Sequence, residues 1–259
     1  MKLLTINTDS KPFEEIQEHF DCLYSTSPNF IINKKIKIPY FYNIYAGELE
    51  GELNYNIFRD FYSKLQGANA VFVNDKKLNK YAEWLDLNSF WVPNSLIENQ
   101  FIFKSKRFFT PKLHIGILSP TAPDIQILLD KLLFIKKTNW EFHITDKKDI
   151  HENCHIFLNL SKDYCFPNND SLEAMRSGCV LISTNLHGNH THIIFDDIHY
   201  IKLDFLDVNI ILDALRYSDK RREKLERIAL GGAKMVNKYF TSKNLDNQKL
   251  NIIRRELGG

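Results

Sequence analysis

The stretch HIFLNLSKDYCFPNNDSLEAMRSGCVLISTNLHGN, residues 155–189, contains the pattern that decides the fold. A short apolar run is followed by a polar loop, an amphipathic segment ending at Gly178, a second apolar run and another polar loop. Short apolar runs are typical of buried parallel strands, and glycine favours the end of a helix because it lacks a Cβ atom. This order of strand, helix and strand predicts a parallel sheet with crossover helices.

The same alternation extends in both directions, which predicts the α/β class. We expect strands over residues 2–7, 20–25, 38–46, 68–74, 89–93, 113–119, 141–145, 155–161, 179–184, 192–195 and 200–204. We expect helices over residues 12–20, 55–65, 76–85, 125–137, 171–177, 208–217, 220–239 and 245–257. The connection between residues 145 and 155 is expected to be a turn.

The elements divide into two Rossmann-like, doubly wound lobes. Residues 1–98 form a shortened N-terminal lobe, and residues 99–112, which have no clear period, form a linker. Residues 113–240 form the second lobe, and residues 241–259 a closing helix that we expect to pack back on the first. The linker run FKSKRFF is interpreted as a strap between the lobes. The alternative is a segment that lies on a membrane surface or stacks with single-stranded nucleic acid.

Composition excludes several classes of protein. Thirty-four Lys plus Arg against 32 Asp plus Glu leaves a net charge of +2, too small for a dedicated nucleic-acid binder. No apolar stretch is long enough to span a bilayer and the N-terminus has no secretory pattern, so we expect a cytoplasmic protein. The four cysteines are scattered and form no C-x-x-C pair, which disfavours structural zinc and a disulfide framework.

The loop over residues 162–170 is the first candidate for a binding site. In open parallel sheets, ligands bind in the crevice beyond the carboxyl ends of the strands, and helix N-termini there favour anionic groups. Asp170 and Glu173 also fit a capping box for the helix that follows, and a capping role and a binding role can coexist. The run LHGNHTH contains His187, His190 and His192, but no carboxylate or cysteine completes a metal motif, so no metal is expected.

The segment SLEAMRSGCVLISTNLHGN resembles the donor-binding segment of the retaining GT-B glycosyltransferases. ANAVFVN and WVPNSL are similar to the strand and junction that end the acceptor lobe of that family, and the closing helices fall in matching places. The resemblance implies a GT-B-like fold that transfers a hexose, with retention, to a glycan, lipid-linked or protein acceptor. It implies a UDP- or GDP-linked sugar as co-substrate without a required metal, and peripheral association with the inner face of the membrane.

Site residues follow from the same resemblance. Glu173 matches the glutamate that binds the ribose of the donor, while Cys165 stands where the family has its other glutamate. The expected donor-binding residues are Glu173, Asp163, Lys162, Tyr164, Phe166, Pro167, Asn168, Asn169, His187, Gly188, Ser119 and Thr121. The expected acceptor-side residues are Tyr45, Gly47 and Glu48.

The sequence also departs from the family pattern. The segment SPTAPDIQ, residues 119–126, contains neither of the two cations with which the family binds the diphosphate, and Asp124 would repel that group. Lys162, Lys147 and Lys148 are the nearest alternatives in sequence, and no catalytic residue is assigned. The missing glutamate and cations leave open a second hypothesis, a non-catalytic homologue that acts as a partner or glycan-recognition subunit.

Overall fold

The computed structural model describes residues 2–6, 21–25, 38–44, 63, 65–73, 79, 82–92, 108–120, 122–135, 137–146, 150–160, 168–184 and 193–258. The chain divides into two compact units, one made of Met1–Pro93 with Leu245–Gly259 and the other of Asn94–Asn244. Each unit contains one five-stranded sheet, and all the strand pairs are parallel. The predicted α/β class with two Rossmann-like lobes is therefore confirmed.

The first sheet keeps its strands in chain order, β1-β2-β3-β4-β5. It contains β1 (Leu3–Ile6), β2 (Cys22–Ser25), β3 (Tyr40–Ile44), β4 (Ala70–Val73) and β5 (Ser89–Trp91). The structure describes only parts of the predicted helices 55–65 and 76–85. Residues 63 and 65 of the first and residues 79 and 82–84 of the second are helical. Predicted helix 12–20 lies outside the described residues.

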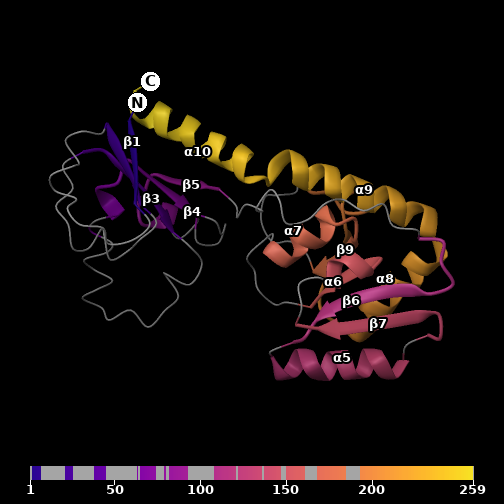
Figure 1. Cartoon of the computed structure of the whole chain (residues 1–259). Helices are drawn as coiled ribbons and strands as arrows, with labels where there is room; N and C mark the ends of the chain where they lie inside the picture. The colour runs from indigo at the N-terminus through magenta and orange to yellow at the C-terminus, as the bar shows by residue number, and fades with distance from the viewer. Residues whose placement is uncertain are drawn as a thin grey trace. The chain divides into compact units, whose positions relative to one another are not determined.

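Helix α10 (Ser242–Glu256) covers one face of this sheet (Figure 1). The buried side chains of the strands, among them Phe41 and Phe72, need an apolar cover on this face. Leu245 and Ile253 of α10 supply it by joining the buried cluster that contains Phe41 and Phe72. At the end of the helix, Asn88 Nδ2 donates to Glu256 Oε2 at 2.8 Å.

The second sheet has the order β10-β9-β8-β6-β7. Its strands are β6 (Leu113–Leu118), β7 (Trp140–Thr145), β8 (Ile156–Asn159), β9 (Val180–Thr184) and β10 (Ile201–Leu203). β6 and β9 are buried at most positions, whereas β7 is half-buried or exposed at every position after Trp140. This pattern is typical of a sheet whose centre is covered on both faces and whose edge, at β7, reaches solvent.

Helices lie on both faces of the second sheet (Figure 1). α5 (Pro123–Ile135) and α8 (Val208–Lys220) pack on one face, in a cluster with Ile115 and Ile117 of β6. α6 (Ile150–Asn153) and α7 (Asn169–Arg176) pack on the other with the second half of α9 (Arg222–Tyr239). The unit is thus doubly wound, with two apolar layers around one sheet.

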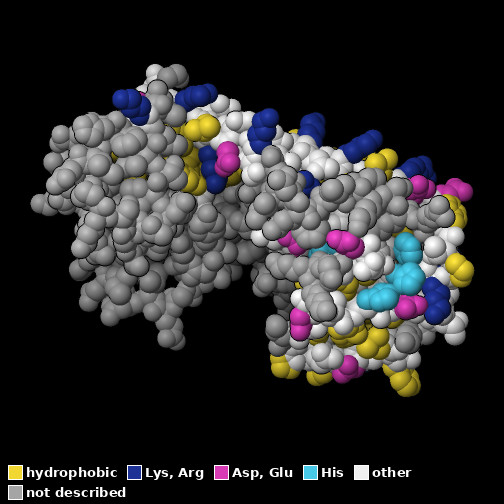
Figure 2. All heavy atoms as spheres, in the orientation of Figure 1, with side chains coloured by type: hydrophobic (Ala, Val, Ile, Leu, Met, Phe, Trp, Pro, Cys, Tyr) yellow, Lys and Arg dark blue, Asp and Glu magenta, His cyan; other side chains and the backbone are white. Residues whose placement is uncertain are grey.

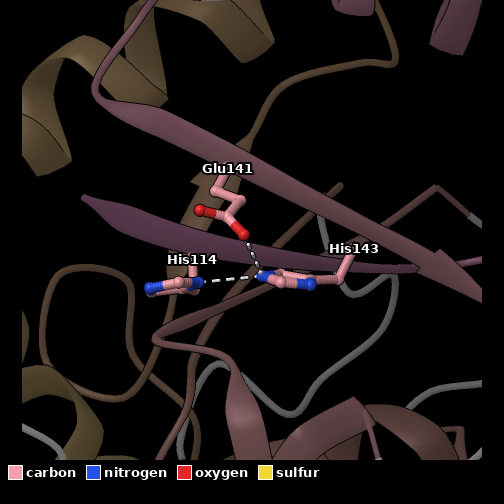
Figure 3. A group of neighbouring side chains, drawn as sticks. All are labelled: His114, Glu141 and His143. Atoms are coloured by element: carbon pink, nitrogen blue, oxygen red, sulfur yellow. Dashed lines mark hydrogen bonds and ion pairs between the residues drawn. The ribbon is translucent and has the colours of Figure 1, made fainter.

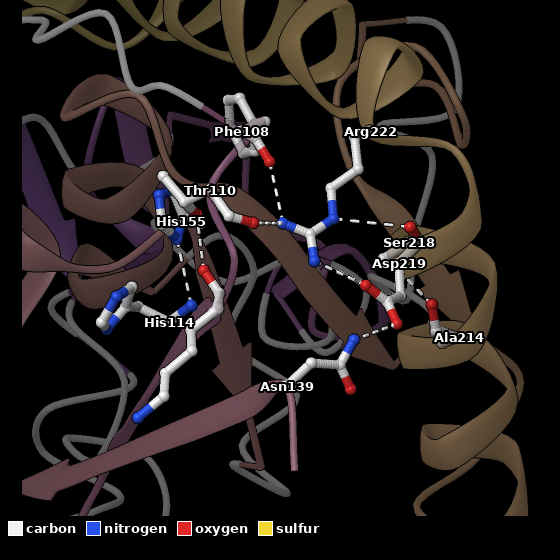
Figure 4. A network of polar contacts seen from close by, with 10 residues as sticks. Phe108, Thr110, His114, Asn139, His155, Ala214, Ser218, Asp219 and Arg222 are labelled. Carbon is white, nitrogen blue, oxygen red and sulfur yellow. Dashed lines mark hydrogen bonds and ion pairs between the residues drawn. The ribbon is translucent and has the colours of Figure 1, made fainter. Parts of the chain in front are cut away.

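Arg222 fixes the segment that leads into β6 (Figure 4). Its guanidinium donates to the backbone oxygens of Phe108, at 2.8 Å, and Thr110, at 3.0 Å. It also donates to Asp219 Oδ1 at 2.5 Å, and Asn139 Nδ2 donates to the other oxygen of Asp219 at 2.6 Å. These bonds connect the end of the predicted linker, the junction of α8 and α9 and the start of β7.

Two local expectations were wrong. The predicted connection between β7 and β8 contains α6, whose four residues are too few to show a helical period in the sequence. The predicted strand 192–195 is not a strand in its described part, residues 193–195. The chain turns there: Phe195 N donates to His199 Nδ1, and Asp197 has a φ of 62°.

No helix among the described residues is long and apolar enough to cross a membrane.

Candidate functional site

The order of the second sheet reverses between β6 and β8. β6 pairs with β7 on one side and with β8 on the other, so the chain winds in one direction from this point and then in the other. Because the register sets Gly116 opposite Phe157, the carboxyl ends Leu118 and Asn159 lie at the same edge. Such a switch point opens a crevice beyond the strand ends, the usual ligand site of an open parallel sheet.

Asn159, the last residue of β8, connects three elements at this edge. Its Nδ2 lies 3.2 Å from Oγ of Ser171 in the first turn of α7 and 3.3 Å from Oγ of Ser183 near the end of β9. Ser171 and Ser183 are both buried. Buried polar groups need hydrogen-bond partners, so these contacts fix the start of α7 beside the strand ends.

The start of α7 faces the same edge. Asn168, in extended backbone geometry, caps the helix: its Oδ1 accepts from Ser171 N at 2.9 Å. The first amide groups of a helix have no partner within the helix and give this end a partial positive charge. The amides of Asn169 and Asp170 can therefore bind an anion, although the Asp170 carboxylate in the same turn opposes it.

This cap differs from the predicted capping box at Asp170 and Glu173. The helix begins two residues earlier, so Asp170 lies inside the first turn and Asn168 is the cap. Asparagine and aspartate are both good caps, and the sequence NNDS offers three in succession. Local sequence alone did not show which of them would start the helix.

The end of α7 shows the predicted glycine stop. Gly178 has a φ of 85°, a conformation that side chains disfavour. Gly178 N donates to Met175 O at 3.1 Å, and Cys179 N donates to Ala174 O at 3.0 Å. This pair of bonds is a Schellman motif, which turns the chain directly into β9.

Glu173 lies one turn into α7. It is 6% exposed, within a helix whose residues from Ser171 to Arg176 are all buried. A carboxylate in such surroundings makes stronger hydrogen bonds than one in water, because the local dielectric is low. The side chain is suited to a specific polar contact and not to general attraction of cations.

The other predicted site residues divide into two groups. Ser119 directly follows β6 at the carboxyl edge of the sheet, where its N donates to Thr145 O at 3.2 Å; Asn168 and Asn169 lie at the start of α7. The following predictions lie outside the described residues: Lys162, Asp163, Tyr164, Phe166, Pro167, His187, Gly188, Thr121, Tyr45, Gly47 and Glu48. Cys165, Lys147 and Lys148 lie outside them as well.

Sequence reasoning missed Asn159, Ser171 and Ser183 at this edge. A detectable signal was present, since each is a polar residue within or beside an otherwise apolar run. A polar residue at the carboxyl end of a buried parallel strand is a site candidate in its own right.

Comparison with known proteins places this fold. No protein-family model and no curated protein sequence matches the chain. The structure of HepE from Anabaena in complex with UDP is similar, with a TM-score of 0.74 and 11% identity over 93% of this chain and 80% of that one. A glycosyltransferase from Rickettsia africae gives a TM-score of 0.68 at 12% identity, over 97% and 84%. Sucrose-phosphate synthase from Thermosynechococcus elongatus gives a TM-score of 0.65 at 10% identity, over 95% of this chain and 80% of that one.

At these identities the likeness establishes the fold. The chain has the GT-B fold, with two Rossmann-like lobes, and the resemblance of residues 171–189 to that class is confirmed at this level.

Proposed function

We propose that the chain is a glycosyltransferase that moves a hexose from a nucleotide-diphosphate sugar, UDP- or GDP-linked, to a glycan, lipid-linked or protein acceptor with retention. The observation that carries the proposal is the edge at Leu118 and Asn159, where a sheet reversal meets the N-terminus of α7. The similar HepE structure contains UDP, which supports a uridine donor. We place the reaction in the cytoplasm, with peripheral contact at the inner face of the membrane.

The chemistry explains why such an edge is suitable. Departure of the nucleotide diphosphate leaves negative charge on the phosphates and positive charge at the anomeric carbon. Backbone amides fixed in advance stabilise the phosphate charge without reorganising during the reaction. The Asn168 cap and the Asn159 contacts fix the amides of Asn169 and Asp170 in this way. The proposal requires no metal ion in this step.

Glu173 is assigned to the ribose of the donor. Its carboxylate would accept hydrogen bonds from the ribose hydroxyls, while Ser119, Asn168 and Asn169 border the phosphate and sugar positions. Lys162, Asp163, Tyr164, Phe166, Pro167, Thr121, His187 and Gly188 are proposed to complete the donor site, and Tyr45, Gly47 and Glu48 the acceptor side.

Calorimetric titration tests donor binding. The full chain is titrated with UDP, GDP and ADP and with their glucose conjugates, and we expect saturable binding of one base in preference to the others. Turnover of the preferred donor is then followed by release of the nucleoside diphosphate with candidate acceptors. Absence of binding by every nucleotide at millimolar concentration would remove the proposal.

Glu173→Gln tests the assigned contact. Glutamine keeps the size of the side chain but removes the charge, which matters because the residue is buried. We expect donor affinity to fall at least tenfold, by more than the accompanying change in stability explains. Glu223→Gln, on the partly exposed first turn of α9, is the matched control and should bind donor as wild type does.

A non-catalytic homologue is the second candidate, favoured by Asp170 in the first turn of α7. This carboxylate lowers the affinity of the turn for an anion. Binding of a glycan acceptor without binding of any nucleotide would support this candidate over the enzyme.

A further inference from the structure

A cluster of two histidines and a glutamate lies on β6 and β7, away from the crevice. The register pairs His114 with Glu141 and Gly116 with His143. Because side chains alternate between the faces of a strand, His114, Glu141 and His143 all project from the same face. Figure 2 shows histidine side chains gathered at the surface beside acidic and basic ones, and Figure 3 shows His114, Glu141 and His143 converging.

Short distances separate the polar atoms of this cluster. His114 Nδ1 lies 2.8 Å from His143 Nε2, and His143 Nε2 lies 3.9 Å from Glu141 Oε1. One potential ligand atom from each residue fits within 4.8 Å of the other two. Ligands at about 2.0–2.2 Å from a tetrahedral zinc ion lie roughly 3.3–3.6 Å apart. The two histidine nitrogens must therefore separate by about half an ångström, and the Glu141 oxygen, which lies within 4.8 Å of both, must approach by up to about 1.5 Å.

We propose that His114, Glu141 and His143 bind one divalent transition metal ion of the zinc class, with a fourth position open to water. Imidazole nitrogen and carboxylate oxygen are ordinary zinc ligands, and three protein ligands plus water is a common set. When the ion binds through the two facing imidazole nitrogens, the proton between them leaves to solvent and the outer nitrogen of the ring that carried it takes up a proton, so both rings stay neutral. This site is separate from the proposed glycosyl transfer, which requires no metal.

Neighbouring groups orient two of the ligands. Lys112 Nζ bonds Glu141 Oε2 at 3.1 Å, which turns Oε1 toward His143. His155 Nδ1 accepts from the backbone N of His114 at 3.0 Å, and the two rings are 5.2 Å apart. Contacts of this kind around metal ligands fix their orientation and raise affinity.

His114 and His143 lie in apolar, strand-like runs, yet their side chains are half-buried and not fully enclosed. The side chain of His143 is 36% exposed and that of Glu141 40% exposed, so the cluster is open to solvent ions. His114 lies four residues before Leu118 and His143 two residues before Thr145, about 13 Å and 7 Å along an extended strand, so the ion would lie on the face of the sheet and not at its carboxyl edge. The ion would instead join the edge strand β7 to β6.

Cobalt substitution tests the site. The full chain is stripped with a chelator, titrated with Co²⁺, followed by visible absorption, and then titrated with Zn²⁺. We expect one Co²⁺ per chain, a four-coordinate spectrum without a thiolate charge-transfer band, displacement by Zn²⁺ and a higher unfolding temperature with Zn²⁺. None of these readouts depends on enzymatic activity.

Variants assign the ligands. His143→Ala and Glu141→Gln should each lower Zn²⁺ affinity by at least the roughly 10–100-fold that follows loss of an outer-shell contact. The control variant, His190→Ala with His192→Ala, removes two histidines of the run LHGNHTH and should keep wild-type affinity. Absence of the cobalt spectrum in wild type, wild-type affinity in both ligand variants, or loss of binding in the control would each overturn the proposal.

Discussion

Asn159, the last residue of β8, donates through Nδ2 to Oγ of Ser171 in the first turn of α7, 3.2 Å away. A second contact from the same amide, to Ser183, reaches β9. The position of the α7 N-terminus beside the strand ends is therefore set by uncharged groups. Asn159, Ser171 and Ser183 carry no charge. They therefore form no ion pair that would compete with a bound diphosphate for the positive end of the helix.

Asn159→Leu should loosen this edge. Leucine has the same branching and the same number of heavy atoms but leaves the hydroxyls of buried Ser171 and Ser183 without the amide, a loss of about 1–3 kcal/mol in the free energy of unfolding. Because the start of α7 would shift, nucleotide affinity should fall by more than the stability loss alone explains. Urea unfolding and calorimetric titration, both at neutral pH, measure the two effects.

Asn209→Ala is the control for this variant. Asn209 is exposed in the first turn of α8 in the same unit, so its loss should change stability by less than about 0.5 kcal/mol. Equal nucleotide affinity for Asn159→Leu and wild type would show that the Asn159 contacts are not needed to hold the site.

Asp170→Asn should strengthen nucleotide binding. The carboxylate lies in the first turn of α7, where it offsets the positive helix end that we propose binds the diphosphate. Its removal also costs a favourable charge–helix interaction of about 0.3–1 kcal/mol, so the variant should be slightly less stable. We expect a several-fold gain in UDP affinity that shrinks as salt is added, because salt screens exposed charges.

Asp130→Asn, exposed on α5, removes the same charge elsewhere in the unit and should leave UDP affinity unchanged. If Asp170→Asn binds UDP less tightly than wild type, the anion does not lie at this helix end.

Elements with long, regular patterns could be predicted from the sequence. β6 and β9 are mostly apolar runs, and α9 repeats apolar residues on one face, so burial largely defines them. α6 has only four residues, and residues 193–195 are apolar but lie in a turn whose geometry depends on His199 and Asp197. Such local structure is set by hydrogen bonds to residues further along the chain, which periodicity does not encode.

The candidate site was predictable in location but not in its contacts. The order of strand, loop and helix was enough to place the start of α7 at the carboxyl edge. The choice of Asn168 over Asp170 as the cap, and the bonds from Asn159, depend on how α7 packs against β8 and β9. The His114 and His143 pair was missed because β6 and β7 become neighbours only in the folded sheet.

Gly232→Ala should destabilise the second unit although alanine is the better helix former. A Cβ atom at this position of α9 would lie 2.7 Å from the backbone oxygen of His199 and 3.1 Å from Met175 Cε. Overpacking costs about 1–3 kcal/mol of stability, whereas the better helix propensity of alanine contributes up to about 1 kcal/mol. We therefore expect the free energy of unfolding to fall by about 1–2 kcal/mol. Thermal unfolding followed by circular dichroism measures it, with Leu230→Ala, on the exposed side of the same helix, as control.

The ion pair of Asp219 and Arg222 should make stability depend on acid pH. Burial alone would raise the pKa of Asp219, but hydrogen bonds from Arg222 and Asn139 outweigh it and hold this pKa below its ordinary value. A carboxyl group whose pKa is lowered by folding adds stability above its unfolded pKa of about 3.9, and this stability is lost as pH falls through the folded value.

Asp219→Asn should therefore be less stable than wild type by a constant amount from pH 8 to pH 5. The difference should shrink as the pH falls below the unfolded pKa of about 3.9 and then through the lower folded value. Urea midpoints at pH 7, 5, 4 and 3 measure it, with Asp213→Asn, an exposed ion pair on α8, as a control that should show little difference at any pH. A difference that persists unchanged at pH 3 would show that Asp219 stabilises the fold through its shape and not through its charge.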